Sequence, residues 1–177
     1  MSNALIPSLI VIMGVSGTGK SSLAECLSNR LHYRFIDADD FHSDEAKAMM
    51  ANAKPITSPI RQAWINRLST YLSELAVKGQ SVVLAYSGLI ASHRKQIAAL
   101  PFKHYPFLLI GDENTIFNRM KNRTSHFANP KLLTSQINSF EPITEEESNL
   151  VLLNLEQSLE QLTDEVISIV VAEESKQ

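Results

Sequence analysis

Residues 14–21 constrain the fold more than any other part of the chain. They read Gly-Val-Ser-Gly-Thr-Gly-Lys-Ser and fit the pattern G-x-x-x-x-G-K-[ST] at every fixed position. An apolar run at 9–13 precedes them, and a run with leucines at 23, 27 and 31 on one helical face follows. A buried strand, a glycine loop and a helix are the context that this pattern requires. The segment therefore predicts an α/β fold with a phosphate-binding loop.

The chemistry of this loop follows from its residue types. Glycines let the backbone curl so that successive N–H groups point at phosphate oxygens, and the following helix adds the positive end of its dipole. Lys20 is expected to reach the β- and γ-phosphates of a nucleotide, and Ser21 to offer its hydroxyl to Mg²⁺. The residues expected to bind the nucleotide here are Gly14, Ser16, Gly17, Thr18, Gly19, Lys20, Ser21 and Ser22.

Composition limits the class of protein. The 177 residues are 44% hydrophobic, which is typical of a globular chain and predicts a single domain over 1–177. The net charge of -3 predicts no general attraction to nucleic acid or to an anionic membrane, and no apolar run reaches membrane-spanning length. A single cysteine rules out an internal disulfide, and the N-terminus shows no export signal, so we expect a cytoplasmic protein.

Strand and helix patterns alternate along the chain. Strands are expected at 8–13, 33–36, 81–86, 107–110 and 149–155. Helices are expected directly after the phosphate loop and at 43–53, 60–77, 91–100, 113–122, 131–140 and 159–171. This alternation predicts a five-stranded parallel sheet covered by helices on both faces, which is a three-layer α/β/α architecture.

A group of carboxylates follows the second predicted strand. The strand at 81–86 ends without an acid, whereas Asp37, Asp39 and Asp40 follow residues 33–36. In a D-x-D after a strand, both carboxylates can face one cleft because side chains alternate with period two. One can orient a metal and its water, and the other can accept the proton of a substrate hydroxyl. The alternative is a solvated acidic turn at a helix start; we favour the site of a small-molecule kinase.

Two arginines lie just before a polar stretch at 124–130. Arg119 and Arg123 are spaced i, i+4 and share one helical face. Arginines at the edge of a polar loop can lie over a triphosphate and neutralise charge that develops during transfer. An exposed basic helix face is the alternative.

Arg61 could pair with an anionic substrate group, or it could only cap a surface. Trp64, three residues later, is expected in the core. His42 and His126 lie close to the motifs and are candidates for contact with the substrate.

Over nearly its whole length the chain resembles the small bacterial-type gluconokinases, phosphate-loop kinases related in fold to shikimate kinase. Besides the phosphate loop and D-x-D, the most distinctive match is Arg-x-x-x-Arg-x-x-His-Phe at 119–127, followed by Leu-Leu-x-Ser-Gln at 132–136. The resemblance implies phosphorylation of D-gluconate to 6-phospho-D-gluconate by ATP and Mg²⁺. It also implies a mobile lid at about 119–140 and suggests a homodimer.

The resemblance gives each candidate residue a role. Lys20, Asp39 and Arg123 are expected to be catalytic, with Asp39 as the base at the sugar hydroxyl. Ser21 is expected to bind the metal directly and Asp37 through water, while Arg119 is expected to contact the nucleotide. Contacts with the substrate are expected from Asp39, His42, Arg61 and His126.

The chain departs from the family pattern on the substrate side. Ala38 replaces the glycine of D-G-D, Ser58 and Ile60 replace two acids, and Met49 and Ile90 replace two lysines. Each buried polar contact that is lost costs about 1–3 kcal/mol. Two alternatives therefore stay open beside gluconate. One is a kinase of another sugar acid or small hydroxylated metabolite, and the other is a nucleotide-binding module that has lost catalysis.

Overall fold

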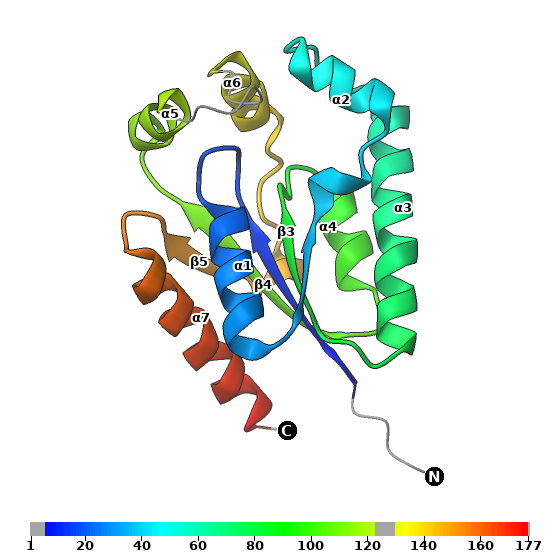
Figure 1. Cartoon of the computed structure of the whole chain (residues 1–177), viewed down its shortest axis with the longest axis vertical. Coiled ribbons are helices and arrows are strands. Elements are labelled where there is room, and N and C mark those ends of the chain that lie inside the picture. The colour runs from blue at the N-terminus through cyan, green and yellow to red at the C-terminus, as the bar shows by residue number, and fades with distance from the viewer. Residues whose placement is uncertain (1–5, 123–129, 177) are drawn as a thin grey trace.

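A five-stranded parallel sheet forms the centre of the molecule, with the strands in the order β2-β3-β1-β4-β5 (Figure 1). The structure is a computed structural model and describes residues 6–122 and 130–176. The strands are β1 (Ser8–Met13), β2 (Arg34–Asp37), β3 (Val82–Tyr86), β4 (Lys103–Ile110) and β5 (Val151–Asn154). The predicted α/β fold with a five-stranded parallel sheet is confirmed.

Helices cover both faces of this sheet (Figure 1). In the described residues they are α1 (Lys20–Leu31), α2 (Asp44–Ala51), α3 (Ser58–Val77), α4 (Ala91–Ala98), α5 (Glu113–Lys121), α6 (Pro130–Ser139) and α7 (Leu159–Glu174), with short 3₁₀ helices η1 (Ala38–Phe41) and η2 (Glu145–Glu147). Side chains of α1 and α7 pack on one face, and those of α3 and α4 pack on the other. No helix in the described part of the chain is long and apolar enough to cross a membrane.

The central strand β1 explains the continuous apolar run before the phosphate loop. All six of its residues are buried. Ile10 and Ile12 contact the layer of α1 and α7, whereas Leu9 and Val11 contact the layer of α3 and α4. A strand that is buried on both faces needs apolar side chains on both, so residues 9–13 do not alternate with polar ones.

Parallel pairing brings the functional segments to one edge of the sheet. Met13 is in register with Tyr86, and Asp37 is in register with Ala85. The carboxyl ends of β1, β2 and β3 therefore meet at one edge, which is where ligands bind in open α/β sheets.

Strand β4 begins at Lys103, four residues before the predicted start at 107. Proline is disfavoured inside central strands because it lacks an N–H donor, so Pro106 argued against this extension. In the structure Lys103 and Pro106 are in register with Ser8 and Val11 of β1. Tertiary pairing with the central strand thus outweighs local propensity.

Candidate active site

The phosphate loop has the backbone that its glycines predict. Gly17 and Gly19 have φ of 87° and 92°, in the left-handed region that other residues rarely adopt. A Cβ on Gly17 would also lie 2.6 Å from Met120 Cγ. Thr18 donates its hydroxyl to the Val15 carbonyl at 2.8 Å, and α1 begins at Lys20. The N-terminus of α1 and the loop amides thus lie next to each other, as anion binding requires.

Ser21 and Asp37 are joined directly. The Ser21 hydroxyl donates to Asp37 Oδ2 at 2.9 Å, and Asp37 Oδ1 accepts the Asp39 N–H at 3.0 Å. Asp39 lies in η1, so the expected alternation of the two carboxylates along an extended strand is wrong. The 3₁₀ turn holds Asp37 at the phosphate loop and leaves the Asp39 carboxylate free to face a neighbouring pocket.

The oxygen atoms of Ser21 and Asp37 fit Mg²⁺, which prefers hard oxygen ligands and usually keeps several waters and phosphate oxygens in its shell. In residues 6–122 and 130–176, no group of three or more His, Cys, Asp or Glu side chains gathers as a metal site. A hydroxyl and one carboxylate beside a phosphate loop are sufficient for an ion that arrives with a nucleotide.

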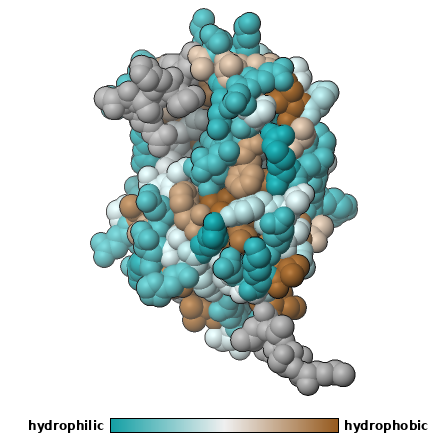
Figure 2. Space-filling model, turned by 45° about the vertical axis from the view of Figure 1, so that its right-hand side comes forward, coloured by the Kyte–Doolittle hydropathy of each residue, from teal (hydrophilic) through white to brown (hydrophobic). Residues whose placement is uncertain are grey.

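A pocket of about 450 Å³ lies beside the loop, between α2, the start of α3, and α6. It brings together Ser16, Lys20, Asp39, His42 and Arg61, all of which the sequence singled out. Figure 2 shows that hydrophobic residues reach the forward face of the molecule in small patches among hydrophilic ones. The pocket has the same mixed character, with apolar walls and charged groups.

Trp64 organises the wall behind Asp39. It is buried, as predicted, and its indole N–H donates to the Ala38 carbonyl at 2.7 Å. The His42 ring stacks on Trp64 with centroids 4.4 Å apart and planes 14° from parallel. His42 Nε2 lies 3.6 Å from Asp39 Oδ1, while its buried Nδ1 has no hydrogen-bond partner in the described part of the chain.

The electrostatic surroundings keep Asp39 ionised. Partial desolvation raises the pKa of this carboxyl, but His42 and Lys20 lower it by more, so the net pKa is below its ordinary value. Asp39 is therefore a carboxylate at neutral pH and can accept a proton.

Other predicted residues lie outside the pocket. Arg119 donates to the Leu155 carbonyl at 2.8 Å, and Ser22 is exposed on α1. Arg123 and His126, with most of the stretch at 124–130, lie outside the described residues.

The substituted positions that raised doubt about gluconate are also outside it. Ser58, Ile60 and Ile90 are not among the described residues that line the pocket, and neither is Met49. None of these four replacements therefore changes a side chain that lines the pocket in this structure.

Gln136 of α6 is a contact that the sequence reasoning did not assign. Its Oε1 accepts the Ser16 N–H of the phosphate loop at 2.7 Å. Gln136 belongs to the Leu-Leu-x-Ser-Gln run, so the run itself was the available signal. Lys47 and Lys54 also line the pocket and were not expected there, because they fall outside any motif.

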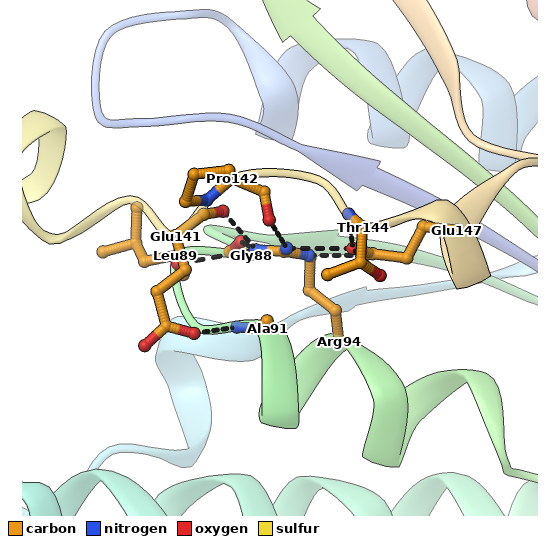
Figure 3. A network of polar contacts seen from close by, with 8 residues as sticks. All are labelled: Gly88, Leu89, Ala91, Arg94, Glu141, Pro142, Thr144 and Glu147. Atoms are coloured by element: carbon orange, nitrogen blue, oxygen red, sulfur yellow. Dashed lines mark hydrogen bonds and ion pairs between the residues drawn. The ribbon is translucent and has the colours of Figure 1, made fainter.

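Arg94 forms a buried hub beneath this site (Figure 3). Its guanidinium pairs with both carboxylate oxygens of Glu147, at 2.6 and 3.0 Å. It also donates to the carbonyls of Gly88, Glu141 and Pro142, at 2.9, 3.2 and 3.1 Å. The hub thus ties the loop after β3 to the segment that leads away from α6.

Comparison with known proteins agrees with this geometry. The sequence profile of the shikimate kinase family matches residues 16–171. A Mus musculus protein described as "Probable gluconokinase" is 32% identical over 178 residues, which cover 91% of this chain and 96% of the relative. The chain belongs to the gluconokinases of the shikimate kinase family.

Solved structures of similar proteins support the same family. A gluconokinase from Sinorhizobium meliloti 1021 is 32% identical, has a TM-score of 0.78, and is matched over 92% of this chain and 91% of that one. A sugar kinase from Janibacter sp. HTCC2649 is 31% identical with a TM-score of 0.85, over 92% and 93% of the two chains. As a family member, this chain is an ATP-using phosphotransferase with an alcohol group as acceptor.

Proposed function

We propose that the protein transfers the γ-phosphoryl group of ATP to the terminal hydroxyl of D-gluconate, giving 6-phospho-D-gluconate. The observation that carries the proposal is the joining, in one pocket, of Lys20 on the phosphate loop, the ionised Asp39 and the cationic Arg61. The choice of gluconate as the substrate rests on the gluconokinases among the relatives of this chain.

The residues divide the reaction between them. The loop amides and Lys20 hold the phosphates and neutralise charge, while Asp39 takes the proton of the attacking hydroxyl. Arg61, His42 and the apolar wall orient the acceptor, because positioning supplies much of the rate in phosphoryl transfer.

Ser21 would hold Mg²⁺ directly and Asp37 through water, in line with their mutual hydrogen bond. When bound, the ion would neutralise negative charge on the phosphates of the nucleotide. We further assign Arg119, Arg123 and His126 to a lid over the nucleotide and substrate. Protection of residues 124–130 from proteolysis by a non-hydrolysable ATP analogue tests this lid, and equal cleavage with and without the analogue contradicts it.

The decisive test is Asp39→Asn in a coupled assay of ADP release with Mg-ATP and D-gluconate. We expect kcat to fall about 10²–10⁴-fold, because the general base is lost. Binding of a non-hydrolysable ATP analogue should stay within twofold, since the phosphate loop is untouched. Asp44→Asn, an exposed acid in the first turn of α2, is the matched control.

Two results would contradict the proposal. Unchanged turnover in Asp39→Asn removes the role of that residue. Intact binding of ATP without any gluconate turnover in the wild-type protein removes gluconate as the substrate, and a panel of other aldonic acids and shikimate then identifies the acceptor.

We also propose that the enzyme is a homodimer of the cytoplasm. Ile110 on β4 and Leu152 on β5 are exposed hydrophobic residues on neighbouring strands at one end of the sheet, which is where a second copy could pack. Light scattering that gives the mass of one chain at micromolar concentration would exclude the dimer.

The single cysteine, Cys26, is free, as expected in a reducing compartment.

A further inference from the structure

Three cations line the part of the pocket that α2 and the start of α3 provide. Lys47 lies on α2, Lys54 follows that helix, and Arg61 lies in the first turns of α3. Figure 1 shows α2 beyond the carboxyl ends of the strands, on the far side of η1 from the sheet. None of the three forms an ion pair with a carboxylate of residues 6–122 or 130–176.

The backbone of each lysine is fixed by local hydrogen bonds. Ser43 caps α2, and its carbonyl accepts the Lys47 N–H at 2.9 Å. At the other end Ala53 adopts a left-handed conformation with φ of 52°, and the Lys54 N–H returns to the Met49 carbonyl at 2.8 Å. Such a helix end fixes where the next side chain leaves the backbone. The backbone positions from which the two lysine side chains extend are therefore fixed.

The charged residues of the pocket come from two parts of the chain, the phosphate loop with η1 and the stretch from α2 to the start of α3. Lys20 and Asp39 stand at the phosphate loop, where the reacting hydroxyl must lie. Met50, Pro55 and Ile56 line the wall near Lys47 and Lys54, and their side chains have no hydrogen-bonding group. The terminal hydroxyl and the carboxylate of an extended sugar acid lie at opposite ends of the molecule. With the hydroxyl at Asp39 and Lys20 at the phosphates, Lys47, Lys54 and Arg61 are the other cations that line the pocket among the described residues and that the carboxylate can meet.

We propose that Lys47 and Lys54 bind the carboxylate of the acceptor and make the enzyme prefer a sugar acid to a neutral polyol. The inference rests on the proposed function, since it assumes that a sugar acid binds in this pocket. A lysine and a carboxylate form a charge-assisted hydrogen bond, whereas a neutral hydroxyl gains much less.

The experiment compares Lys47→Met, Lys54→Met and the double variant with the wild type. Lys78→Met is the matched control, because Lys78 is an exposed lysine at the far end of α3. Each protein is assayed with D-gluconate and with D-glucitol, which has the same carbon chain and a hydroxymethyl group in place of the carboxylate. Calorimetry measures gluconate binding in the presence of a non-hydrolysable ATP analogue.

Each lysine variant should raise KM and the dissociation constant for gluconate about tenfold, the effect of one charged hydrogen bond. Its kcat should stay within twofold, because neither lysine touches the reacting atoms. The kcat/KM for D-glucitol should be unchanged in every variant. Lys78→Met should match the wild type with both substrates.

The outcomes separate the two proposals. If the double variant binds gluconate as tightly as the wild type, the lysine assignment alone is overturned. It is also overturned if kcat/KM falls as much with D-glucitol as with gluconate. Gluconate binding without turnover in the wild type overturns the proposed function alone. Failure of the wild type to bind gluconate overturns both.

Discussion

At the scale of single residues, the proposed base, Asp39, depends on side chains packed behind it in the pocket wall. Trp64 holds the Ala38 carbonyl and the His42 ring, and His42 lies beside the Asp39 carboxylate. Stacking between two rings needs both planes in place, so the buried indole determines where the imidazole lies. The charge state of Asp39 therefore depends on packing as well as on the nearby Lys20.

Replacing His42 with phenylalanine tests this dependence. The aromatic ring can still stack on Trp64, but the nitrogen beside Asp39 is gone. Because His42 helps to lower the pKa of Asp39, we expect that pKa to rise in the variant. Asp39 acts as a base only when ionised, so the acidic limb of kcat/KM should move to higher pH.

The measurement is the pH dependence of kcat/KM for gluconate in both proteins, with thermal unfolding as a check on the fold. If the acidic limbs coincide while the two proteins are equally stable, His42 does not influence the base.

At the scale of elements, α6 and the phosphate loop are joined by the Gln136–Ser16 contact. Residues of α6 line the pocket, and the glutamine of this helix accepts an amide of the phosphate loop. The contact aligns α6 with the nucleotide site, so the helix and the loop should act as one unit during transfer.

Gln136→Ala should lower kcat about tenfold, because the hydrogen bond between uncharged groups that positions the loop is lost. Affinity for a non-hydrolysable ATP analogue should change less than threefold, since the remaining loop amides are intact. Asn138→Ala, an exposed residue of the same helix, serves as the control. Equal kinetics in the two variants would mean that the contact has no part in turnover.

The sequence predicted the elements well and the long-range contacts poorly. Strand and helix types follow from periodicity, which is local, so the errors were boundaries such as the start of β4 and the short 3₁₀ helix η1 after β2. Lys20 and Asp39 were found because they lie in or next to a motif. Gln136 was given no role because its partner, Ser16, is 120 positions away, and periodicity does not report on contacts at that separation.

At the scale of the whole molecule, the Arg94 hub links parts of the chain that differ in role. Leu89, in the loop after β3, lines the substrate pocket, and the Glu141 N–H donates to its carbonyl at 2.7 Å. The Arg94 side chain is 3% exposed, so its charge is held by protein groups and not by water. Removing it would take from Glu147 its charged partner and from several carbonyls a hydrogen-bond donor.

Arg94→Met should lower the free energy of unfolding by about 3–5 kcal/mol, as expected when one partner of a buried pair is lost. Lys95→Met offers a neighbouring control, since the Lys95–Glu146 pair is 74% and 73% exposed and should contribute less than about 1 kcal/mol. Urea unfolding at neutral pH measures both changes. Similar losses in the two variants would contradict the central role of the hub.

The same pair predicts how stability depends on pH. The hydrogen bond from Arg94 lowers the pKa of Glu147 in the folded protein. The stabilisation is then complete above the pKa of a free glutamate, about 4.3, and is lost as the pH falls through the folded value. The acidic decline of stability should be shallower in Arg94→Met than in the wild type, and parallel declines would exclude this contribution.

The order of the strands also determines when the protein can fold during synthesis. The central strand β1 is made first, yet both of its neighbours come much later, β3 at Val82–Tyr86 and β4 at Lys103–Ile110. A nascent chain shorter than about 110 residues therefore carries a largely apolar strand with one or both edges unpaired, a state that invites aggregation. Chains truncated at residue 98 should leave 8–13 open to proteases, and protection there would contradict this order. The central strand of the sheet is thus the one that waits longest on the ribosome for its partners.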